Sequence, residues 1–515
     1  AGCQEPIIPE NVFRQEGRRR RTAAPCTVVI FGASGDLTRR KLVPALYNLT
    51  VEQLLGAGCS LVGYARREKS HAQFREEMHG AIQAFSRRKP DPAIWSGLEQ
   101  GIYYCQGSFE DLEHYRQLKA MLDGLDRERG TGGNRLFYLA TPPSYYAQIV
   151  RLLGESGLAE EMPGSWSRII VEKPFGHDLE SAHALNGEIG DVFQEEQIYR
   201  IDHYLGKETV QNILAFRLGN AIFEPLWNNR FVDHVELTVA ESLGMEGRGA
   251  YFDEAGILRD MVQNHIFQVL TLVAMEPPVT LEADEVRDEK VKVLKSIRLL
   301  SPTEIYRSVV RAQYLGGAVA GKPARGILDE PNIPPDSRTE TYVAIRLELE
   351  SWRWAGVPFY IRTGKRLPRR VTEVSIHFKH PPYALFQSES SSSPSANVMV
   401  LRIQPDEGMS LTFNSKAPGQ IMRLDPVRMD FNYATSFGAE PSEAYERLLL
   451  DCMIGDSTLF TRRDEVELSW RYITSILEAW RRPDAPGLAT YEAGTWGPAE
   501  GDLLLHRDGR RWRRL

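Results

Sequence analysis

A strand–turn–helix signature lies near the amino end, where Thr27-Val28-Val29-Ile30-Phe31 runs directly into Gly32-Ala33-Ser34-Gly35-Asp36-Leu37. The first five residues are a short β-branched run, which predicts a buried strand, and a helical pattern of apolar residues continues from Arg39. Glycine lets the backbone turn tightly and approach a pyrophosphate, and the amino end of a helix offers free N–H groups. This order predicts a dinucleotide site. The alternative is an ordinary glycine turn, because the spacing is G-x-x-G and not G-x-G-x-x-G.

Up to about residue 205 the chain alternates short apolar runs with helical patterns. Further apolar runs lie at 61–65, 136–140 and 168–171, with helical stretches between them. Continuous apolar runs separated by helices predict a parallel sheet with both faces covered. We therefore expect an α/β, Rossmann-like dinucleotide-binding domain over residues 26–205.

After about residue 230 the pattern changes to alternating polar and apolar residues. The alternation predicts half-buried strands, most simply in one large and mostly antiparallel sheet, at 234–239, 342–349, 374–378, 398–403 and 410–413. Helices expected at about 254–275 and 441–454 would cover one face of this sheet. The architecture is thus an α/β domain followed by an α+β domain, and we expect the second over residues 206–515.

Two segments lie outside these domains or between their strands. Residues 1–25 contain Pro, Gly and four consecutive arginines, and we expect a flexible, solvated arm. An organelle-targeting signal is the alternative, which Glu5, Glu10 and Glu16 argue against. The serine-rich segment 388–395 predicts a mobile loop.

Composition excludes several classes of function. The chain has 515 residues with 62 Lys or Arg and 69 Asp or Glu, a net charge of −7, which argues against a general nucleic-acid-binding surface. It has no run of about 18 apolar residues and no secretory signal pattern, so we expect no membrane span and a cytoplasmic protein. The cysteines are sparse and odd in number, which favours a reducing compartment over a disulfide framework: Cys3, Cys26, Cys59, Cys105 and Cys452.

The histidine spacing does not predict a metal centre. His377 and His380 are three residues apart in an expected strand, so they would point to opposite faces. We therefore expect no metal cofactor.

A pair of arginines bears on the choice of coenzyme. Arg66 and Arg67 follow the expected strand 61–65, where a site for NAD usually has an acid that holds the ribose 2′-hydroxyl. A basic residue there accommodates a 2′-phosphate instead, which favours NADP. A solvated arginine pair is the alternative.

A lysine follows the expected strand 168–171. In Glu172-Lys173-Pro174, Lys173 would lie at the carboxyl edge of the sheet, where α/β proteins bind ligands. Pro174 is a candidate for a cis peptide bond. A surface Lys–Pro turn is the alternative.

Four polar residues cluster before an expected helix from Glu208. Asp202, His203, Tyr204 and Lys207 fall within six residues, and the last three can all donate to one anion beside the helix start. This predicts a phosphate site. The alternative is a capped helix start with a salt bridge.

One histidine lies in a helical stripe of apolar residues. His265 is surrounded in sequence by Leu258, Met261, Val262 and Ile266 at helical spacing. Such a histidine is either a satisfied core residue or a base that a carboxylate orients in a partly dry site.

Taken together, these segments resemble the glucose-6-phosphate dehydrogenase family, in the style of its bacterial members. The resemblance covers nearly the whole chain from about residue 26, and it is carried by residues 32–37, 172–176, 200–207, 246–254, 259–265, 362–365 and 494–498. Segment 200–207 is its most specific part. Other two-domain sugar oxidoreductases share the glycine turn and a Glu-Lys-Pro motif but lack this segment.

The resemblance implies a role for each matching residue. His265 matches the general base, Asp202 its carboxylate partner, and Lys173 a lysine between substrate and coenzyme. The sugar-phosphate site would be His203, Tyr204 and Lys207. The sugar hydroxyls would be held by Glu241, Asp260, Lys365 and Gln404, with Arg370 as a further basic residue near the substrate. The coenzyme would be held by Gly32, Ala33, Ser34, Gly35, Asp36, Leu37, Arg66, Tyr146 and Lys173.

The implied reaction is the oxidation of β-D-glucose 6-phosphate at C1 to 6-phospho-D-glucono-1,5-lactone with NADP, the first step of the oxidative pentose phosphate pathway. The resemblance also implies a homodimer or homotetramer, with the large sheet at the dimer interface. Animal members carry a second, structural NADP site. Arg362 and Arg402 resemble parts of that site, but Val371 and Ser375 replace other basic positions, so we do not expect it here.

Three alternatives stay open. One is another two-domain sugar oxidoreductase. A second is a non-catalytic sensor or scaffold that binds NADP, although such a protein would be expected to lose Asp202 or His265, and both are present. The third is a redox-regulated enzyme that uses some of the five cysteines, against the simpler view that these are isolated thiols.

Overall fold

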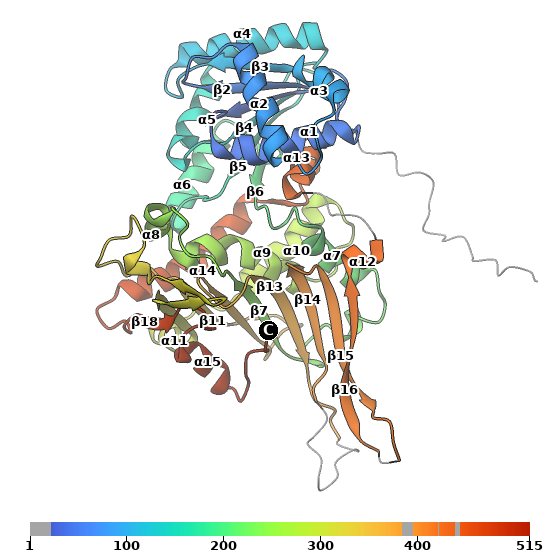
Figure 1. The fold of residues 1–515 in the computed structure, drawn as a ribbon, viewed down its shortest axis with the longest axis vertical. Helices are drawn as coiled ribbons and strands as arrows, with labels where there is room; N and C mark the ends of the chain where they lie inside the picture. Colours follow the sequence, from blue (N-terminus) through green and yellow to red (C-terminus); the bar gives the residue numbers. More distant parts are fainter. Residues whose placement is uncertain (1–21, 384–394, 421, 438–442) are drawn as a thin grey trace, which may run out of the picture. The chain divides into compact units, whose positions relative to one another are not determined.

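The structure is a computed structural model that describes residues 22–383, 395–420, 422–437 and 443–515 (Figure 1). Most of the predicted arm, residues 1–21, and most of the predicted serine-rich loop lie outside the described residues. The described chain forms two compact units. The first comprises the chain through Val171 with Val192–Ile198 and Tyr445–Ser457, and the second comprises the remainder. These limits differ from the predicted 26–205 and 206–515.

The first unit contains five parallel strands in the order β5-β4-β1-β2-β3. Their bounds are β1 Thr27–Phe31, β2 Ser60–Ala65, β3 Ile102–Gln106, β4 Arg135–Leu139 and β5 Ser167–Glu172. Its helices are α1 Val43–Val51, α2 His71–Phe85, α3 Pro92–Glu99, α4 Leu112–Arg129, α5 Tyr146–Glu155 and α13 Ala444–Ile454. The parallel sheet is confirmed. Every residue of β1, β2 and β4 is buried, which explains their continuous apolar runs. Strand β3 was not predicted.

Two expectations about the first unit are corrected. Ala23 falls within the predicted arm 1–25, but it forms a parallel bridge with Leu55 and is buried. The helix expected at 441–454 is predicted to cover the antiparallel sheet, but α13 belongs to the first unit. There the Glu446 carboxylate accepts from Asn48 and from Arg87, each at 2.8 Å, and these buried polar contacts hold the helix in place.

The second unit is built on a nine-stranded sheet in the order β16-β15-β14-β13-β7-β12-β11-β8-β18. The bounds are β7 Val232–Ala240, β8 Val309–Leu315, β11 Tyr342–Glu348, β12 Pro358–Gly364, β13 Val371–Phe378, β14 Val398–Gln404, β15 Gly408–Lys416, β16 Leu424–Asn432 and β18 Ala489–Glu492. The pairs β7–β12 and β8–β18 are parallel and the others antiparallel. The mostly antiparallel sheet is therefore confirmed. Strands β8, β12, β16 and β18 were not predicted.

The remaining elements of the second unit are short strands and helices. The strands are β6 Ile198–Ile201, β9 Gly317–Val319, β10 Lys322–Ala324 and β17 Phe460–Thr461. The helices are α6 Leu179–Gly190, α7 Glu208–Leu218, α8 Gly249–Ile257, α9 Phe267–Ala274, α10 Ala283–Ser296, α11 Pro302–Ser308, α12 Tyr433–Phe437, α14 Arg463–Arg481 and α15 Ala499–His506. Among the described residues, no helix is both long enough and apolar enough to cross a membrane.

The polar residues His234, Glu236 and Thr238 of β7 are buried and Asp233 is half-buried, although alternation predicted a solvated face. The chain's last residues cover this face: Arg510 forms an ion pair with Asp233, and the backbone N–H of Arg513 donates to Glu236 at 2.9 Å. The indole of Trp512 lies over the Arg362 guanidinium at 4.5 Å. The alternating pattern therefore identified the polar positions of this strand. Their burial depends on a segment that is distant in sequence.

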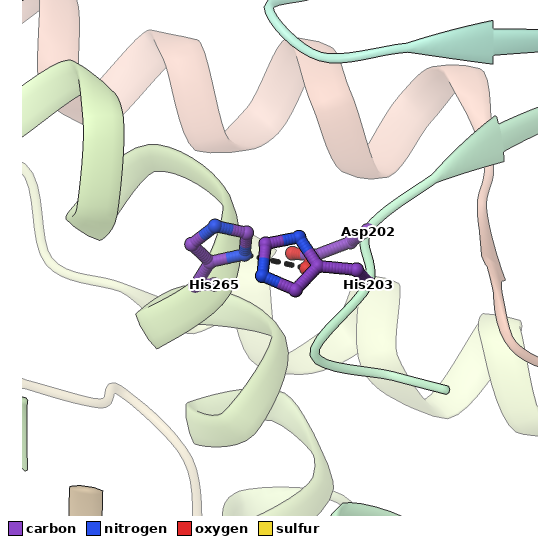
Figure 2. Close-up of side chains that lie close together, drawn as sticks. All are labelled: Asp202, His203 and His265. Atoms are coloured by element: carbon purple, nitrogen blue, oxygen red, sulfur yellow. Dashed lines mark hydrogen bonds and ion pairs between the residues drawn. The ribbon is translucent and has the colours of Figure 1, made fainter. Parts of the chain in front are cut away.

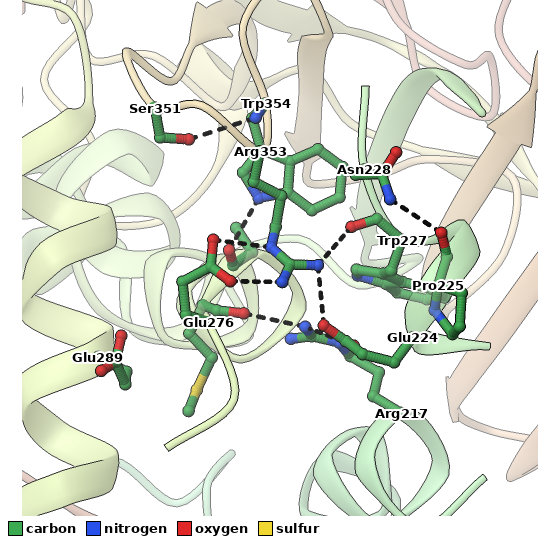
Figure 3. Close-up of polar contacts among 12 residues, drawn as sticks. Arg217, Glu224, Pro225, Trp227, Asn228, Glu276, Glu289, Ser351, Arg353 and Trp354 are labelled. Atoms are coloured by element: carbon green, nitrogen blue, oxygen red, sulfur yellow. Dashed lines mark hydrogen bonds and ion pairs between the residues drawn. The ribbon is translucent and has the colours of Figure 1, made fainter. Parts of the chain in front are cut away.

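The helix that carries the predicted base has its carboxyl end capped by side chains. Residues Leu258–Ile266 are π-helical and continue into α9. The last carbonyl groups of α9 accept from Arg217, from the Trp227 indole at 2.7 Å and from the Trp354 indole at 2.8 Å. Figure 3 shows Arg217, Trp227 and Trp354 gathered there, with Arg353 between the carboxylates of Glu224 and Glu276. These contacts satisfy backbone groups that a helix end otherwise leaves without partners.

Candidate active site

Asp202 and His265 form a buried pair in the second unit (Figure 2). Nδ1 of His265 lies 2.5 Å from Oδ1 of Asp202, and each side chain is at most 2% exposed. Asp202 follows β6, and the backbone N–H of Tyr204 donates to the same Oδ1 at 2.9 Å, which fixes the carboxylate. The structure therefore brings together the two residues predicted as base and carboxylate.

The environment of this pair favours a carboxylate beside a neutral imidazole. Burial alone would raise the pKa of Asp202, but the charge and hydrogen bond of His265 outweigh it and hold that pKa well below its usual range. Burial lowers the pKa of His265, Lys173 acts in the same direction, and Asp202 opposes both. Because Nδ1–H is donated to Asp202, the lone pair on Nε2 of His265 is the one that can accept a proton.

Lys173 is directed at the other ring nitrogen of His265. Its Nζ lies 2.7 Å from Nε2 of His265, 3.1 Å from the backbone oxygen of Asp260 and 3.2 Å from Oδ1 of Asp260. These three acceptors match the three N–H groups of an ammonium. Burial would raise the pKa of Asp260, but Lys173 and Lys365 hold it below its ordinary value. The Lys173–Pro174 peptide bond is cis, as predicted.

Two cations meet at one neutral acceptor near this pair. Oε1 of Gln404 accepts from Nζ of Lys207 at 2.8 Å and from Nη2 of Arg370 at 3.0 Å. Among the described residues, no carboxylate forms an ion pair with either cation. Burial lowers the pKa of Lys207 to about 8, and Arg370 adds to this effect. A place with two cations and no paired carboxylate suits an anion such as a phosphate ester.

His203 and Tyr204 complete this part of the site. Burial holds the pKa of His203 well below its usual range, so His203 offers a hydrogen bond and no charge. The Tyr204 ring lies 3.9 Å from Nζ of Lys207. Residues 202–207 therefore supply the carboxylate at one end and the predicted phosphate ligands at the other.

Glu241 and Lys365 form an ion pair immediately after the carboxyl ends of β7 and β12 in the large sheet. Strands β7 and β12 run parallel, and Ala240 is the register partner of Gly364. The next residue of each strand is therefore placed beside the other, which explains the pair. The roles of these two residues toward sugar hydroxyls stay predictions.

Thr372 belongs to the site and was not predicted. Its Oγ1 accepts from Nε2 of Gln404 at 2.9 Å, and the two residues are register partners in β13 and β14. Nε2 of Gln404 also faces the Tyr204 hydroxyl at 3.4 Å. A single threonine two residues after Arg370 gives no local signal, because register between two strands does not follow from either strand alone.

The predicted coenzyme loop lies at the carboxyl edge of the first sheet. Gly32 has φ +83°, and a Cβ at that position would meet the backbone oxygen of Ala140 at 2.3 Å, so only glycine fits. Ala33 is buried and Gly35 partly exposed, whereas Ser34 and Asp36 are exposed. The helix begins at Asp36 and Leu37, earlier than the predicted Arg39. The first N–H groups of this helix have no intrahelical acceptor, as a bound phosphate requires.

Arg66 follows β2 at the same edge as the loop. Strands β1 and β2 are parallel neighbours, and the N–H of Gly32 donates to the backbone oxygen of Tyr64 at 2.9 Å. Arg66 is exposed, as a 2′-phosphate ligand requires. Tyr146 is only 1% exposed at the start of α5, so the structure gives its predicted coenzyme contact no support. All these coenzyme roles stay predictions.

Two groups of described side chains have donor atoms close enough together to be considered as metal-binding sites. The first is Asp202, His203 and His265, in which the carboxylate and a ring nitrogen already share a hydrogen bond. The second is His234, Glu236 and His377. The two imidazoles there stack at 4.1 Å with 14° between their planes, so their in-plane lone pairs do not converge on one ion. His380 lies beyond the end of β13, so the predicted opposition of His377 and His380 in one strand was wrong.

Comparison with known proteins assigns both parts of the chain to one family. Residues 29–212 match the glucose-6-phosphate dehydrogenase NAD binding domain, and residues 214–513 match the glucose-6-phosphate dehydrogenase C-terminal domain. The glucose-6-phosphate 1-dehydrogenase of Chlamydia pneumoniae is 49% identical over 500 residues, which is 96% of this chain and 97% of the relative. That of Aggregatibacter actinomycetemcomitans is 50% identical over 495 residues, which is 96% of this chain and 98% of the relative.

Solved structures lead to the same family. One, described as glucose-6-phosphate dehydrogenase in complex with its substrate glucose-6-phosphate, has a TM-score of 0.87 at 36% identity and covers 96% of this chain and 99% of its own. Another, a glucose-6-phosphate 1-dehydrogenase from Mycobacterium avium, has a TM-score of 0.81 at 36% identity over 96% of this chain and 99% of its own. From its sequence and its fold, this chain belongs to the glucose-6-phosphate dehydrogenase family.

Proposed function

We propose that the chain oxidises β-D-glucose 6-phosphate at C1 to 6-phospho-D-glucono-1,5-lactone and uses NADP as the hydride acceptor, the first step of the oxidative pentose phosphate pathway. The observation that carries this proposal is the buried Asp202–His265 pair, whose second ring nitrogen, Nε2, lies in the same site as the cations Lys207 and Arg370. A base and an anion site together fit a sugar phosphate. A non-catalytic sensor would have no need for the buried pair.

The proton of the C1 hydroxyl moves to Nε2 of His265 as the hydride leaves C1. The lowered pKa of His265 keeps this nitrogen unprotonated near neutral pH, so it can act as a general base. Asp202 holds the Nδ1–H and stabilises the imidazolium that forms, as a carboxylate does beside other catalytic histidines. NADP supplies the two-electron acceptor.

Lys173 marks where the reacting hydroxyl binds. Its Nζ now donates to Nε2 of His265, the atom that must accept the C1 proton. A sugar hydroxyl that donates to Nε2 takes over this contact, and Lys173 keeps its two contacts to Asp260. The displaced N–H of Lys173 is then free to donate to the oxygen of that hydroxyl, which fixes its orientation.

The phosphate group binds at Lys207, His203 and Tyr204, with Arg370 nearby, because two cations meet there and no carboxylate of the described chain pairs with either. Binding energy at the phosphate is remote from C1 and positions the sugar for hydride transfer. Glu241, Asp260, Lys365 and Gln404 are proposed to hold the sugar hydroxyls. The Glu241–Lys365 pair offers both acceptors and donors for that task.

NADP is proposed to bind at the loop of Gly32, Ala33, Ser34, Gly35, Asp36 and Leu37, with Arg66 toward the 2′-phosphate. The residues fit this group, since the loop turns tightly at Gly32, exposes Ser34 and precedes a helix amino end. The active protein is proposed to be a homodimer or homotetramer in the cytoplasm.

The test follows the absorbance of the reduced nicotinamide with glucose 6-phosphate and NADP, and with free glucose in place of the phosphate ester. Reduction that requires the ester supports the proposal. No reduction, or equal rates with free glucose, contradicts it.

The base is tested by His265→Asn, which we expect to lower kcat by about 10²–10⁴ with little change in KM. His183→Asn is the matched control, because His183 is 66% exposed, pairs with Glu467 and is not among the proposed site residues. A His265→Asn enzyme with normal kcat removes His265 from the base role.

A further inference from the structure

Two cysteines distant in sequence lie side by side in the first unit. Cys26 precedes β1 and Cys59 precedes β2, and these parallel strands pair Thr27 with Ser60. The N–H of Ser60 donates to the backbone oxygen of Cys26 at 2.9 Å, so the ladder continues to the cysteines. Adjacent strands are about 4.8 Å apart, and residues opposite one another in a parallel pair point to the same face. The two side chains are therefore neighbours, close enough for their thiols to interact, and the Cys59 thiol donates to the backbone oxygen of Ala24 at 3.8 Å.

The two sulfurs differ in burial and in acidity. Cys26 is fully buried and Cys59 is partly exposed. The hydrogen bond from Cys26, backbone hydrogen bonds at Cys26 and Gly56, and the nearby Arg129 together lower the pKa of Cys59 to about 7 despite its burial. The hydrogen bond to Cys59 and burial raise the pKa of Cys26 well above the usual range. Cys59 is thus the better nucleophile near neutral pH.

A small cavity reaches Cys59. It has a volume of about 20 Å³ and is lined by Cys59 together with apolar residues such as Leu55, Leu61 and Ile102. A space of this size holds about one water-sized molecule. The cavity is therefore large enough for a molecule the size of hydrogen peroxide beside Cys59.

We propose that Cys26 and Cys59 form a redox-active dithiol, in which hydrogen peroxide oxidises Cys59 and Cys26 closes a disulfide. The Cys59 thiolate attacks one peroxide oxygen, the O–O bond breaks, and the leaving hydroxide takes a proton to become water. Cys59 is then a sulfenic acid, and the peroxide has accepted two electrons. The Cys26 sulfur attacks Cys59, the S–S bond forms, the S–O bond breaks, and the Cys26 proton leaves with the hydroxide as a second water.

The geometry allows the cross-link without a large movement of the backbone. Disulfides need Cα atoms about 4.4–6.8 Å apart, and opposed residues in neighbouring parallel strands fall in this range. In a reducing compartment, a disulfide of this kind is a reversible modification and not a permanent structural disulfide. This site goes beyond the proposed catalytic function, because it lies at the amino ends of β1 and β2 and shares no residue with the catalytic groups.

The first test maps the modification. A Cys3→Ser protein is fully reduced, freed of reductant and treated with stoichiometric hydrogen peroxide, and its peptides are analysed by mass spectrometry. We expect a Cys26–Cys59 disulfide that dithiothreitol reverses. In Cys26→Ser the sulfenic acid on Cys59 should persist and react with dimedone, and Cys59→Ser should give neither product. Cys105→Ser is the matched control and should behave as the parent.

A second measurement needs no substitution in the pair. The rate of alkylation by iodoacetamide, followed for each cysteine against pH, should show Cys59 reacting fastest, with a midpoint near pH 7. A disulfide that joins Cys26 to Cys452, thiol loss that is unchanged in Cys59→Ser, or selective alkylation of Cys105 would each overturn the proposal.

Discussion

The rings of Tyr204 and His265 stack with their centroids 4.3 Å apart and 22° between their planes. The same Tyr204 ring lies 3.9 Å from Nζ of Lys207. One aromatic side chain therefore contacts both the proposed base and a proposed phosphate ligand. Because the ring is rigid, it sets the position of the imidazole relative to the phosphate site.

This contact predicts different effects for two substitutions of Tyr204. Tyr204→Phe keeps the stacked ring and loses only the hydroxyl, so we expect KM for the sugar phosphate to rise while kcat stays within about twofold. Tyr204→Leu loses the stacking, worth about 0.5–1.5 kcal/mol, and should lower kcat about two- to tenfold as well. Steady-state kinetics on both variants measure the changes in KM and in kcat separately. Equal kcat values in the two variants would show that the ring does not position the base.

The buried carboxylate makes a separate prediction. Asp202→Asn keeps the shape of the side chain but removes the charge that holds the Nδ1–H of His265. We expect kcat to fall by about 10²–10⁴, the range associated with a misdirected or unassisted histidine base. The acid limb of kcat/KM in the parent enzyme should lie below pH 6.5, because burial lowers the pKa of His265 and only the neutral ring accepts a proton. A pH profile for each protein tests both statements, and an unchanged kcat in Asp202→Asn would contradict the assigned partnership.

Substrate affinity should fall in alkaline solution because of Lys207. Its pKa in the free protein is lowered to about 8, and a bound phosphate dianion favours the ammonium and raises that pKa. Binding then takes up a proton above about pH 8, so Kd rises with pH, by about tenfold between pH 7 and pH 9. Calorimetric titration with glucose 6-phosphate measures the change.

Lys207→Arg is the matched control for this pH dependence. An arginine stays charged over the whole range and should flatten the rise in Kd. A rise that persists in Lys207→Arg would assign the titration to another group.

Coenzyme selectivity should depend on Arg66. Its exposed side chain follows β2 at the edge that carries the glycine loop. Arg66→Ala removes a charge-assisted contact to the 2′-phosphate worth about 1.5–3 kcal/mol, so KM for NADP should rise about 10- to 100-fold while KM for NAD changes little. Arg67→Ala is the neighbouring control and should change neither constant more than about threefold. If Arg66→Ala leaves the ratio of KM for NADP to KM for NAD unchanged, Arg66 does not determine the preference for NADP.

The capped end of α9 makes a prediction about the stability of the fold. Trp354→Phe removes the indole N–H that donates to the backbone oxygen of Ala274 and leaves space in a buried site. We expect a loss of about 2–4 kcal/mol from the unpaired carbonyl and the cavity. Trp352→Phe is the matched control, because Trp352 is 99% exposed. Thermal unfolding of both variants at one scan rate checks this, and equal midpoints would show that the cap contributes nothing.

Local features of the sequence were enough to predict the two-part architecture. The apolar runs at β1, β2, β4 and β5 predicted the parallel sheet because strands buried on both faces are continuously apolar, and that signal needs no knowledge of the rest of the chain. The cluster at residues 202–207 could be recognised for the same reason, since its members are neighbours along the chain. The family resemblance added His265 to this cluster.

Tertiary structure alone decided which distant residues meet. The pairing of Thr372 with Gln404, the contact between Lys173 and His265, and the burial of Glu236 under the last residues of the chain all join segments far apart in sequence. A hydrophobic pattern repeats every two or about 3.6 residues, so it shows which face of an element is apolar. It carries no information on register or on the segment that covers a polar face, because these depend on the free energy of the whole packed chain.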